Sequence, residues 1–184
     1  MRKILIPLTF IVTIIASLSL LAFVTSCVTS NDSFRTGGKM TAVRQIFPSA
    51  TDIAEIPFFI SQGAQVSGRP DDAKISEIKG YSGLLGYCVE SEVVSRSGPF
   101  RIRVLLNPQL YVKQATVISY PWKRGRDVGR RVFTDQFTGK GPGDAIRLGR
   151  DIDAMTGATI SSRVMTRGVR DAIELVRNLI NESI

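Results

Sequence analysis

Two neighbouring segments, AKISEIKG (73–80) and GLLGYCVESEVV (83–94), are strand-like, because the pattern of apolar residues changes there to a period of two. Two further segments of the same character follow: GPFRIRVLLNP (98–108) and QLYVKQATVISYPW (109–122). Ser-Gly and Asn-Pro pairs supply the turns between them. Four such segments in succession predict an antiparallel meander with one covered face, and this sheet forms the centre of the fold.

Segments with helical spacing flank the predicted strands. Four apolar residues between 39 and 47 predict a short first helix, which Pro48 ends. Residues 61–72 form a loop by composition. Beyond Gly125 an apolar stripe predicts a second helical segment, with Gly139 as its stop signal. The members of that stripe are Val128, Val132, Phe133 and Phe137.

A third helix begins near Ile160, after the Gly-rich connection GKGPGDAIRLGRD (139–151). Its apolar residues recur at spacings of three to five and form a stripe that packs on the sheet. They are Ile160, Val164, Val169, Ile173, Val176 and Ile180. Strands followed by helices predict an α+β domain, with a mostly antiparallel sheet and helices packed on one face.

The N-terminus has the pattern of a targeting segment, because Arg2 and Lys3 precede an uncharged run from Ile4 to Val24. That run also has the roughly 20 residues that a helix needs to span a bilayer. The sequence VTSC (24–27) resembles a bacterial lipobox, which favours cleavage before Cys27 and lipid attachment to it. The expected organisation is therefore a lipoprotein-type signal peptide or membrane anchor (1–26), a polar tether (27–39) and one domain (40–184).

Either form of the N-terminus places the domain outside the cytoplasm, tethered to membrane lipid by Cys27 or by an uncleaved helix. Without residues 1–26 the formal charge falls from +8 to +6, so the chain remains basic. An exported basic chain favours anionic lipid headgroups or an anionic cofactor over nucleic acid. With no His, and with Cys88 as its one remaining thiol, the domain is expected to contain neither a disulfide framework nor a metal site.

Two other segments carry weaker signals. The glycines of GKGPGDA (139–145) match neither a Walker loop nor the dinucleotide fingerprint, so a turn is the favoured interpretation. The basic stretch WKRGRDVGRR (122–131) is either a solvated loop and helix face or a contact for lipid headgroups or an acidic partner. No carboxylate pair with a nearby His or Cys indicates a hydrolase.

The strongest chemical signal is DAMTGATISS (153–162). Asp153, Thr156 or Thr159 can each cap the last helix by accepting hydrogen bonds from its free N–H groups. A Thr hydroxyl at a helix N-terminus also lies where the helix dipole and those N–H groups stabilise a phosphate. Gly157 and Ala158 leave the backbone open to an approaching group. The residues alone allow both roles.

DAMTGAT (153–159) resembles the flavinylation signature of the FMN-binding domain family, in which FMN is joined by a phosphoester to the last Thr. The segments VFTDQFTGK (132–140) and KGYSGLLGYCVE (79–90) are similar to other parts of that family. The family includes flavin-carrying subunits of the Rnf and sodium-pumping NADH:quinone oxidoreductase complexes. The resemblance implies that an FAD:protein FMN transferase attaches FMN to Thr159, with Asp153, Thr156, Gly157 and Ala158 around the attachment site.

The resemblance predicts an extracytoplasmic electron-transfer flavoprotein, which takes electrons from a membrane donor and passes them to a downstream redox acceptor. The alternatives are a flavin-dependent reductase of a small extracellular acceptor, a subunit of an Rnf-like or NQR-like complex, and a lipoprotein in which the motif only caps a helix. Complex subunits often have a Glu-Thr stretch where this chain has YPWKRGRDVG (120–129). That departure favours a stand-alone protein.

Overall fold

The structure is a computed structural model that describes residues 30–57 and 72–182. The expected N-terminal segment 1–26, Cys27 and nearly all of the expected loop 61–72 lie outside the described residues. By its internal contacts the chain divides into residues 1–42 and 43–184. The second unit contains the whole sheet and the helices that follow it.

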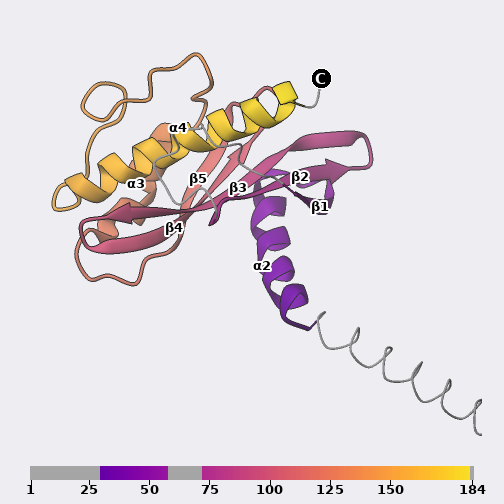
Figure 1. Ribbon diagram of the computed structural model, residues 1–184, viewed down its shortest axis with the longest axis horizontal. Helices are drawn as coiled ribbons and strands as arrows, with labels where there is room; N and C mark the ends of the chain where they lie inside the picture. Colours follow the sequence, from indigo (N-terminus) through magenta and orange to yellow (C-terminus); the bar gives the residue numbers. More distant parts are fainter. Residues whose placement is uncertain (1–29, 58–71, 183–184) are drawn as a thin grey trace, which may run out of the picture. The chain divides into compact units, whose positions relative to one another are not determined.

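The second unit is built on a five-stranded antiparallel sheet in which each strand pairs with the next along the chain (Figure 1). The meander and the α+β class predicted from the sequence are confirmed. The strands are β1 (Ala50–Ile56), β2 (Lys74–Gly80), β3 (Gly83–Ser95), β4 (Gly98–Leu106) and β5 (Val112–Ser119).

The first strand, β1, was not among the predicted ones. Its segment ATDIAEI mixes apolar and polar residues, and most of its side chains are exposed or half-buried. Among the described residues it pairs with β2 alone, as an edge strand, and it buries no continuous apolar face that would mark it in the sequence. The helix before it, α2 (Ser30–Ile46), begins earlier than the expected short helix and includes residues assigned to the tether.

The long strands β3 and β4 pair in regular register from Tyr87 opposite Leu106 to Ser95 opposite Gly98. Only Arg96 and Ser97 remain for the turn between them. Because neighbouring residues of a strand point to opposite faces, fully buried neighbours show that both faces are covered. Val89 and Cys88 are both fully buried, as are Val104 and Leu105. The sheet therefore has two covered faces at its centre, in place of the one expected.

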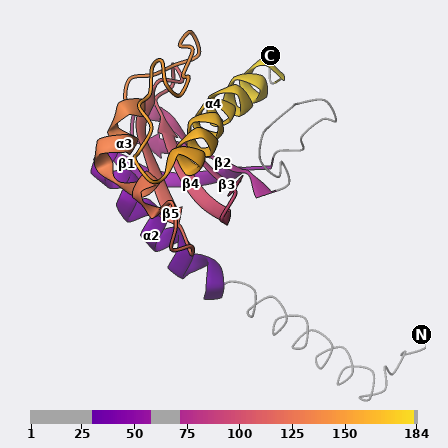
Figure 2. The same ribbon diagram turned by 90° about the vertical axis from the view of Figure 1, so that its left-hand side faces the viewer.

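The last helix, α4 (Thr159–Glu182), lies along one face of the sheet against β3 and β4 (Figures 1 and 2). Of the predicted apolar stripe, Val169, Ile173 and Val176 are buried, whereas Val164 and Ile180 are half-buried. Ile160 is different, because it is 46% exposed. Gly168 allows the close approach of the two layers: a Cβ there would lie 2.7 Å from Val93 and 2.8 Å from Ile102.

The segment between β5 and α4 is more broken than the predicted single helix. It forms η2 (Arg126–Gly129), α3 (Arg131–Thr134) and η3 (Asp135–Phe137), and Arg130 interrupts them in an extended conformation with φ −73° and ψ 141°. Val128, Phe133 and Phe137 are fully buried, but Val132 is 66% exposed. The expected stripe therefore loses Val132, since the break at Arg130 changes the helical phase.

Candidate functional site

A cavity of about 620 Å³ opens at the start of α4. Three segments that are distant in the sequence form its wall: the β3–β4 turn, the chain just before η2, and the turn that leads into α4. The lining residues are Ser95, Arg96, Ser97, Arg124, Gly125, Gly157, Ala158, Thr159, Ile160 and Ser161. Most of them are small or polar, so backbone atoms contribute much of this surface.

The turn into α4 is held in a tight conformation. The Ala158 N–H donates to the Met155 carbonyl at 3.0 Å, and Gly157 has φ 76°. A positive φ at the third position of such a turn is typical of type II geometry, which favours glycine. The Met155 N–H donates to Ser162 Oγ at 3.1 Å, which ties the turn to the first turn of the helix.

Thr159 is the first residue of α4, and its exposed side chain lines the cavity. The first intrahelical bond runs from the Ser162 N–H to the Ala158 carbonyl at 2.8 Å. The N–H groups that precede it in the helix have no partner one turn earlier within the helix. These groups and the helix dipole make the wall around Thr159 favourable for a negatively charged group.

Trp122 fixes the second segment of the wall against the β3–β4 turn. Its indole N–H donates to the Pro99 carbonyl at 2.7 Å. Its ring lies on Gly98, where a Cβ would be only 2.2 Å from the indole Cζ2 atom. Any residue larger than glycine at 98 would displace the indole, so this pair fixes the approach of the chain after β5 to the turn that carries Arg96.

Tyr120 joins the second segment to the helix. Its hydroxyl donates to the Arg124 carbonyl at 2.8 Å and lies 2.9 Å from the buried Ser161 Oγ. Because the tyrosine proton is used on Arg124, the Ser161 hydroxyl donates to Tyr120. Gly125 lies between them with φ 81°, and a Cβ there would be 2.5 Å from both hydroxyl oxygens. Only glycine fits this position without a shift of its neighbours.

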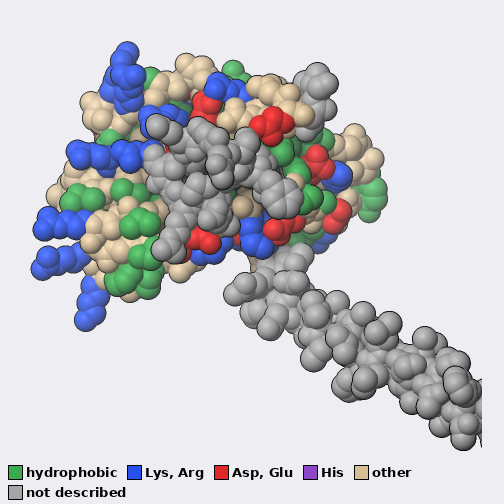
Figure 3. Space-filling model, viewed as in Figure 1, with side chains coloured by type: hydrophobic (Ala, Val, Ile, Leu, Met, Phe, Trp, Pro, Cys, Tyr) green, Lys and Arg blue, Asp and Glu red, His purple; other side chains and the backbone are tan. Residues whose placement is uncertain are grey.

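The cavity wall is positively charged. Arg96 and Arg124 belong to it, both are exposed, and no carboxylate is among the lining residues. Figure 3 shows Lys and Arg side chains gathered at the end of the molecule that lies to the left in the view. The start of α4 and the β3–β4 turn lie at that same end in Figure 1. An anionic group is the ligand that this wall favours.

Of the five motif residues singled out in the sequence, the cavity includes Gly157, Ala158 and Thr159, but neither Asp153 nor Thr156. The backbone of Asp153 bonds instead to the Gln136 side chain, which accepts from the Asp153 N–H at 2.7 Å and donates to its carbonyl at 3.3 Å. This pair holds the start of the motif against the turn of η3. Asp153 therefore lies in the loop that presents Thr159 and outside the cavity wall.

Sequence reasoning missed the β3–β4 turn and Ser161 as parts of the site. A two-residue turn with a Gly after it is a visible signal for a hairpin, but not for its contact with the start of α4. The basic stretch was interpreted as a solvated face or a contact for lipid headgroups or an acidic partner. One of its members, Arg124, lines the cavity, whereas Arg126 does not.

Two further findings concern the chain over residues 30–57 and 72–182. No three His, Cys, Asp or Glu side chains in these residues are grouped so that they could hold a metal ion. No helix formed by them combines the length and apolar character needed to cross a bilayer. Cys88 is buried within β3 and does not line the cavity.

Comparison with known proteins identifies a curated relative and a family. The relative belongs to a proton-translocating ferredoxin:NAD(+) oxidoreductase complex of Clostridium ljungdahlii, as one of its subunits, and is 31% identical over 100 residues. The match covers 50% of this chain and 54% of the relative, so the chain spans about half the length of that protein. Residues 70–174 match the FMN-binding domain family and include the β3–β4 turn, Arg124 and Thr159. The chain therefore belongs to the FMN-binding domain family.

Proposed function

We propose that this protein carries FMN on Thr159 through a phosphoester and transfers electrons outside the cytoplasm. The observation that supports the proposal most directly is the position of Thr159, at the first residue of α4 and in the wall of a large positively charged cavity. The electron-transfer role rests on the similarity to a component of a ferredoxin:NAD(+) oxidoreductase complex.

The residues of the cavity fit FMN. Its volume of about 620 Å³ is within the range of about 300–1,000 Å³ that is usual for cofactor-sized ligands. Gly125, Gly157 and Ala158 leave room for a flat ring system to approach the backbone. Arg96, Arg124 and the free N–H groups of the helix start supply donors and positive charge for a phosphate. No acidic side chain among the lining residues opposes it.

The proposed attachment of FMN to Thr159 is a transfer of a phosphoryl group to a hydroxyl. In the proposed reaction an FAD:protein FMN transferase delivers the FMN half of FAD to the Thr159 hydroxyl. The Thr159 hydroxyl gives up its proton as the bond from its Oγ1 to the FMN phosphorus forms. The bond from that phosphorus to the AMP half breaks, and AMP leaves. The tight turn at Met155 and Gly157 positions the hydroxyl, and the start of α4 stabilises the charge of the new phosphodiester.

A bond to Thr159 has a clear advantage outside the cytoplasm. A site that binds by mass action alone empties when the free ligand falls below its dissociation constant, whereas an ester does not dissociate. Bound FMN supplies one- and two-electron redox chemistry. The protein positions the ring system and sets the charge around it. Arg96 and Arg124 favour anionic reduced flavin and so raise its potential.

The N-terminal residues set the location in this proposal. Cleavage at VTSC and lipid on Cys27 would anchor the domain to the membrane, and an uncleaved segment 1–26 would do so as a helix. Several acyl chains are needed for lasting attachment, because each buried methylene contributes only about 0.8 kcal/mol. A tethered domain would then meet a membrane electron donor and a downstream redox acceptor.

A second candidate function is that of a subunit in a larger membrane redox complex, which the similarity to a complex component favours. The two candidates share the flavin and differ in partners. Purification of the tagged chain from membranes of its native host separates them, since a subunit would co-purify in constant ratio with other redox proteins. A stand-alone carrier would be recovered without them.

Intact mass spectrometry of the full chain tests the central proposal. The chain is expressed with and without an FAD:protein FMN transferase, and FMN phosphoester formation is expected only with the enzyme. Peptide mapping is expected to place the added mass on Thr159, and the same spectra report the state of the N-terminus and Cys27. An unmodified Thr159 peptide from the native host would refute the proposal. Turnover of a small acceptor by the purified flavoprotein alone would favour a reductase instead.

A further inference from the structure

A second cavity, of about 180 Å³, lies farther along α4, between the helix and the loop at 146–148. Four arginines contribute to its wall, three from the helix and one from the loop. The lining residues are Ile146, Arg147, Leu148, Arg163, Thr166, Arg167 and Arg170. None of them lines the cavity at the start of α4, so the two are separate sites.

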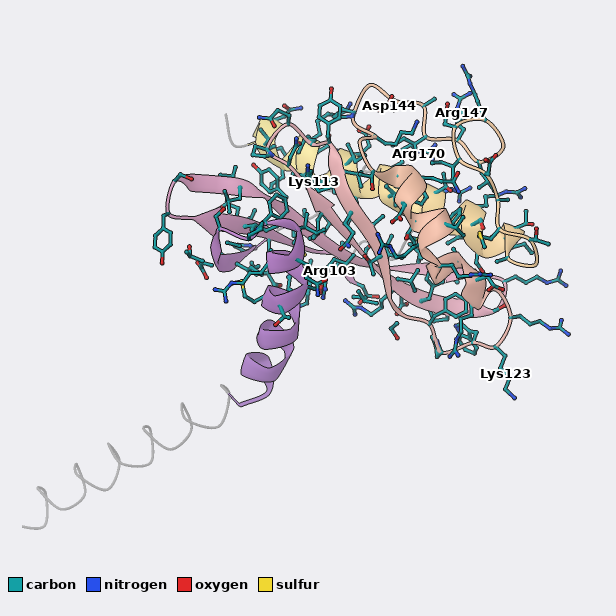
Figure 4. The ribbon with its side chains drawn as sticks, turned by 180° about the vertical axis from the view of Figure 1, so that it is seen from behind. Arg103, Lys113, Lys123, Asp144, Arg147 and Arg170 are labelled. Atoms are coloured by element: carbon teal, nitrogen blue, oxygen red, sulfur yellow. The ribbon has the colours of Figure 1, made fainter. Side chains whose placement is uncertain are left out.

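The fold places four arginines around one cavity. Arg163, Arg167 and Arg170 have the spacing i, i+4, i+7, which places them on one face of the helix. Arg147 lines the cavity from the loop, and both it and Arg170 lie toward the top of the view in Figure 4. Thr166, between them on the helix, is buried and donates its hydroxyl proton to the Ser162 carbonyl at 2.8 Å. The donors left for a ligand are therefore the arginines.

The loop that carries Arg147 is held in shape by its own bonds. The Arg147 N–H donates to Asp151 Oδ2 at 3.1 Å, and the Arg147 carbonyl accepts from the N–H groups of Asp151 and Ile152. A bridge between Leu148 and Ile152 and the buried Ile146 side chain anchor the loop to the core. Arg147 thus belongs to an ordered wall of the cavity.

The charges of this wall are not balanced within the described residues. No carboxylate lines the cavity, and none of the ion pairs found in 30–57 and 72–182 includes any of the four arginines. By contrast, Arg103, Arg130, Arg131 and Arg177 each pair with an acidic side chain. Four like charges around one small cavity repel one another, and an anion between them relieves that repulsion.

We infer that this cavity binds a phosphate group. Guanidinium groups match the geometry of phosphate oxygens and form short, charge-assisted hydrogen bonds to them. The cavity is far smaller than the one at the start of α4, so it admits a single phosphate and not a flavin. The phosphate is either a free anion or the headgroup of an anionic lipid, which has the same binding chemistry. The inference does not depend on a flavin at Thr159.

Calorimetric titration of the full chain in an uncharged detergent tests the site, with inorganic phosphate as the probe and chloride used to hold ionic strength constant. Saturable binding is expected, and Arg167→Gln is expected to weaken it about tenfold through the loss of a charge-assisted contact. Arg150→Gln is the matched control, because Arg150 is an exposed arginine of the same loop region outside the cavity wall.

Arg124→Gln distinguishes the two cavities. Phosphate binding that falls with Arg124→Gln and not with Arg167→Gln would assign the anion to the cavity at the start of α4 and overturn the inference. Absence of saturable phosphate binding, together with absence of the vesicle effect described next, would overturn it as well. An equal loss of phosphate binding in Arg150→Gln and Arg167→Gln would indicate general charge attraction and would also reject a defined site.

Vesicles distinguish the two sources of phosphate. The full chain is used with both vesicle types, so that a lipid on Cys27 or the N-terminal segment contributes equally to membrane binding in each. If the source is a lipid headgroup, vesicles with phosphatidic acid are expected to bind this domain better than vesicles with phosphatidylserine of equal net charge. Arg167→Gln is expected to remove that difference, whereas Arg150→Gln keeps it. Equal binding to both vesicles, with saturable inorganic phosphate binding, assigns the cavity to a free anion.

Discussion

The two cavities beside α4 are built by different means. The cavity at the start of the helix uses backbone atoms, glycines and short polar side chains, with two arginines in its wall. The cavity farther along is formed mainly by long arginine side chains. A wall of backbone and small residues leaves a large, shaped space, whereas a wall of long cations leaves a small space of high charge. The composition of each wall therefore decides which ligand the cavity can hold.

The difference extends to how the two walls respond to mutation. In the first cavity Tyr120, Trp122 and two glycines fix the backbone, so single substitutions are expected to change shape. In the second the arginines project from a regular helix face, so single substitutions are expected to change charge and leave the fold intact. Four predictions concern the first cavity. Gly125→Ala and Tyr120→Phe test how its backbone is fixed, whereas Thr159→Ala and Arg124→Gln test the bond and the charge proposed there.

The largest effect is expected for Thr159→Ala, which removes the hydroxyl proposed to accept FMN. The variant is expected to fold and to contain no covalent flavin after co-expression with the transferase, as measured by intact mass and by absorbance. Thr138→Ala, at another exposed threonine, is the control and is expected to be fully modified. Covalent flavin in Thr159→Ala would show that the attachment residue lies elsewhere.

Gly125→Ala is expected to lower the free energy of unfolding by about 2–4 kcal/mol, from the strain of a positive φ and the displacement of two hydroxyl groups. Gly149→Ala isolates the first contribution, because Gly149 has the same φ of 81° and no atom within 4 Å of a Cβ. A loss of about 1 kcal/mol is expected there. Equal losses in urea titrations of the two variants would mean that the contact with Tyr120 and Ser161 does not constrain the site.

Tyr120→Phe is expected to cost about 1–2 kcal/mol, because it leaves the buried Ser161 hydroxyl without its acceptor and the Arg124 carbonyl without its donor. Tyr111→Phe is the control, since Tyr111 is 47% exposed and no hydrogen bond of its hydroxyl is seen. Urea titrations measure the free energy of unfolding of both variants. Identical midpoints would indicate that the Tyr120 hydroxyl does not hold the second segment of the wall to α4.

The smallest effect is expected for Arg124→Gln, which removes one exposed positive charge from the cavity wall. It is expected to lower the midpoint potential of the bound flavin by about 10–30 mV, where 30 mV corresponds to about 1.4 kcal/mol for two electrons. Arg126→Gln, two residues away and outside the wall, is expected to change it less. Equal potentials in spectroelectrochemical titrations of the two variants would exclude a specific role for Arg124.

The sequence was sufficient for the parts of the fold that follow from local pattern. The apolar periodicity predicted β2 to β5 and the extent of α4, because each of these elements buries a continuous face of its own. It failed at β1, which is an edge strand with mostly exposed or half-buried side chains, and at Val132, where an extended Arg130 breaks the helical phase. Neither feature leaves a periodic signal, since both depend on contacts with distant residues.

The residues of the candidate site likewise fall into those that a local motif predicts and those that the tertiary fold brings together. Gly157, Ala158 and Thr159 are contiguous and were found from their motif, and all three line the cavity. Ser95, Arg96 and Ser97 reach it only because β3 and β4 are long enough to bring their turn to the start of α4. The indole of Trp122 on Gly98 completes this wall. This contact between distant segments depends on strand length and helix packing, which patterns in a single sequence do not encode.

The position of the candidate site depends on Gly168, which lies outside it. The glycine lies nine residues after Thr159, about 14 Å along the helix axis, where α4 is closest to Val93 and Ile102. A methyl group added there would clash with the sheet and tilt the helix. A tilt about this point displaces the ends of the helix more than its middle. The hydroxyl at the first turn would then change its position relative to Arg96 and Arg124. Alignment of the proposed attachment residue thus depends on a remote position that has no side chain.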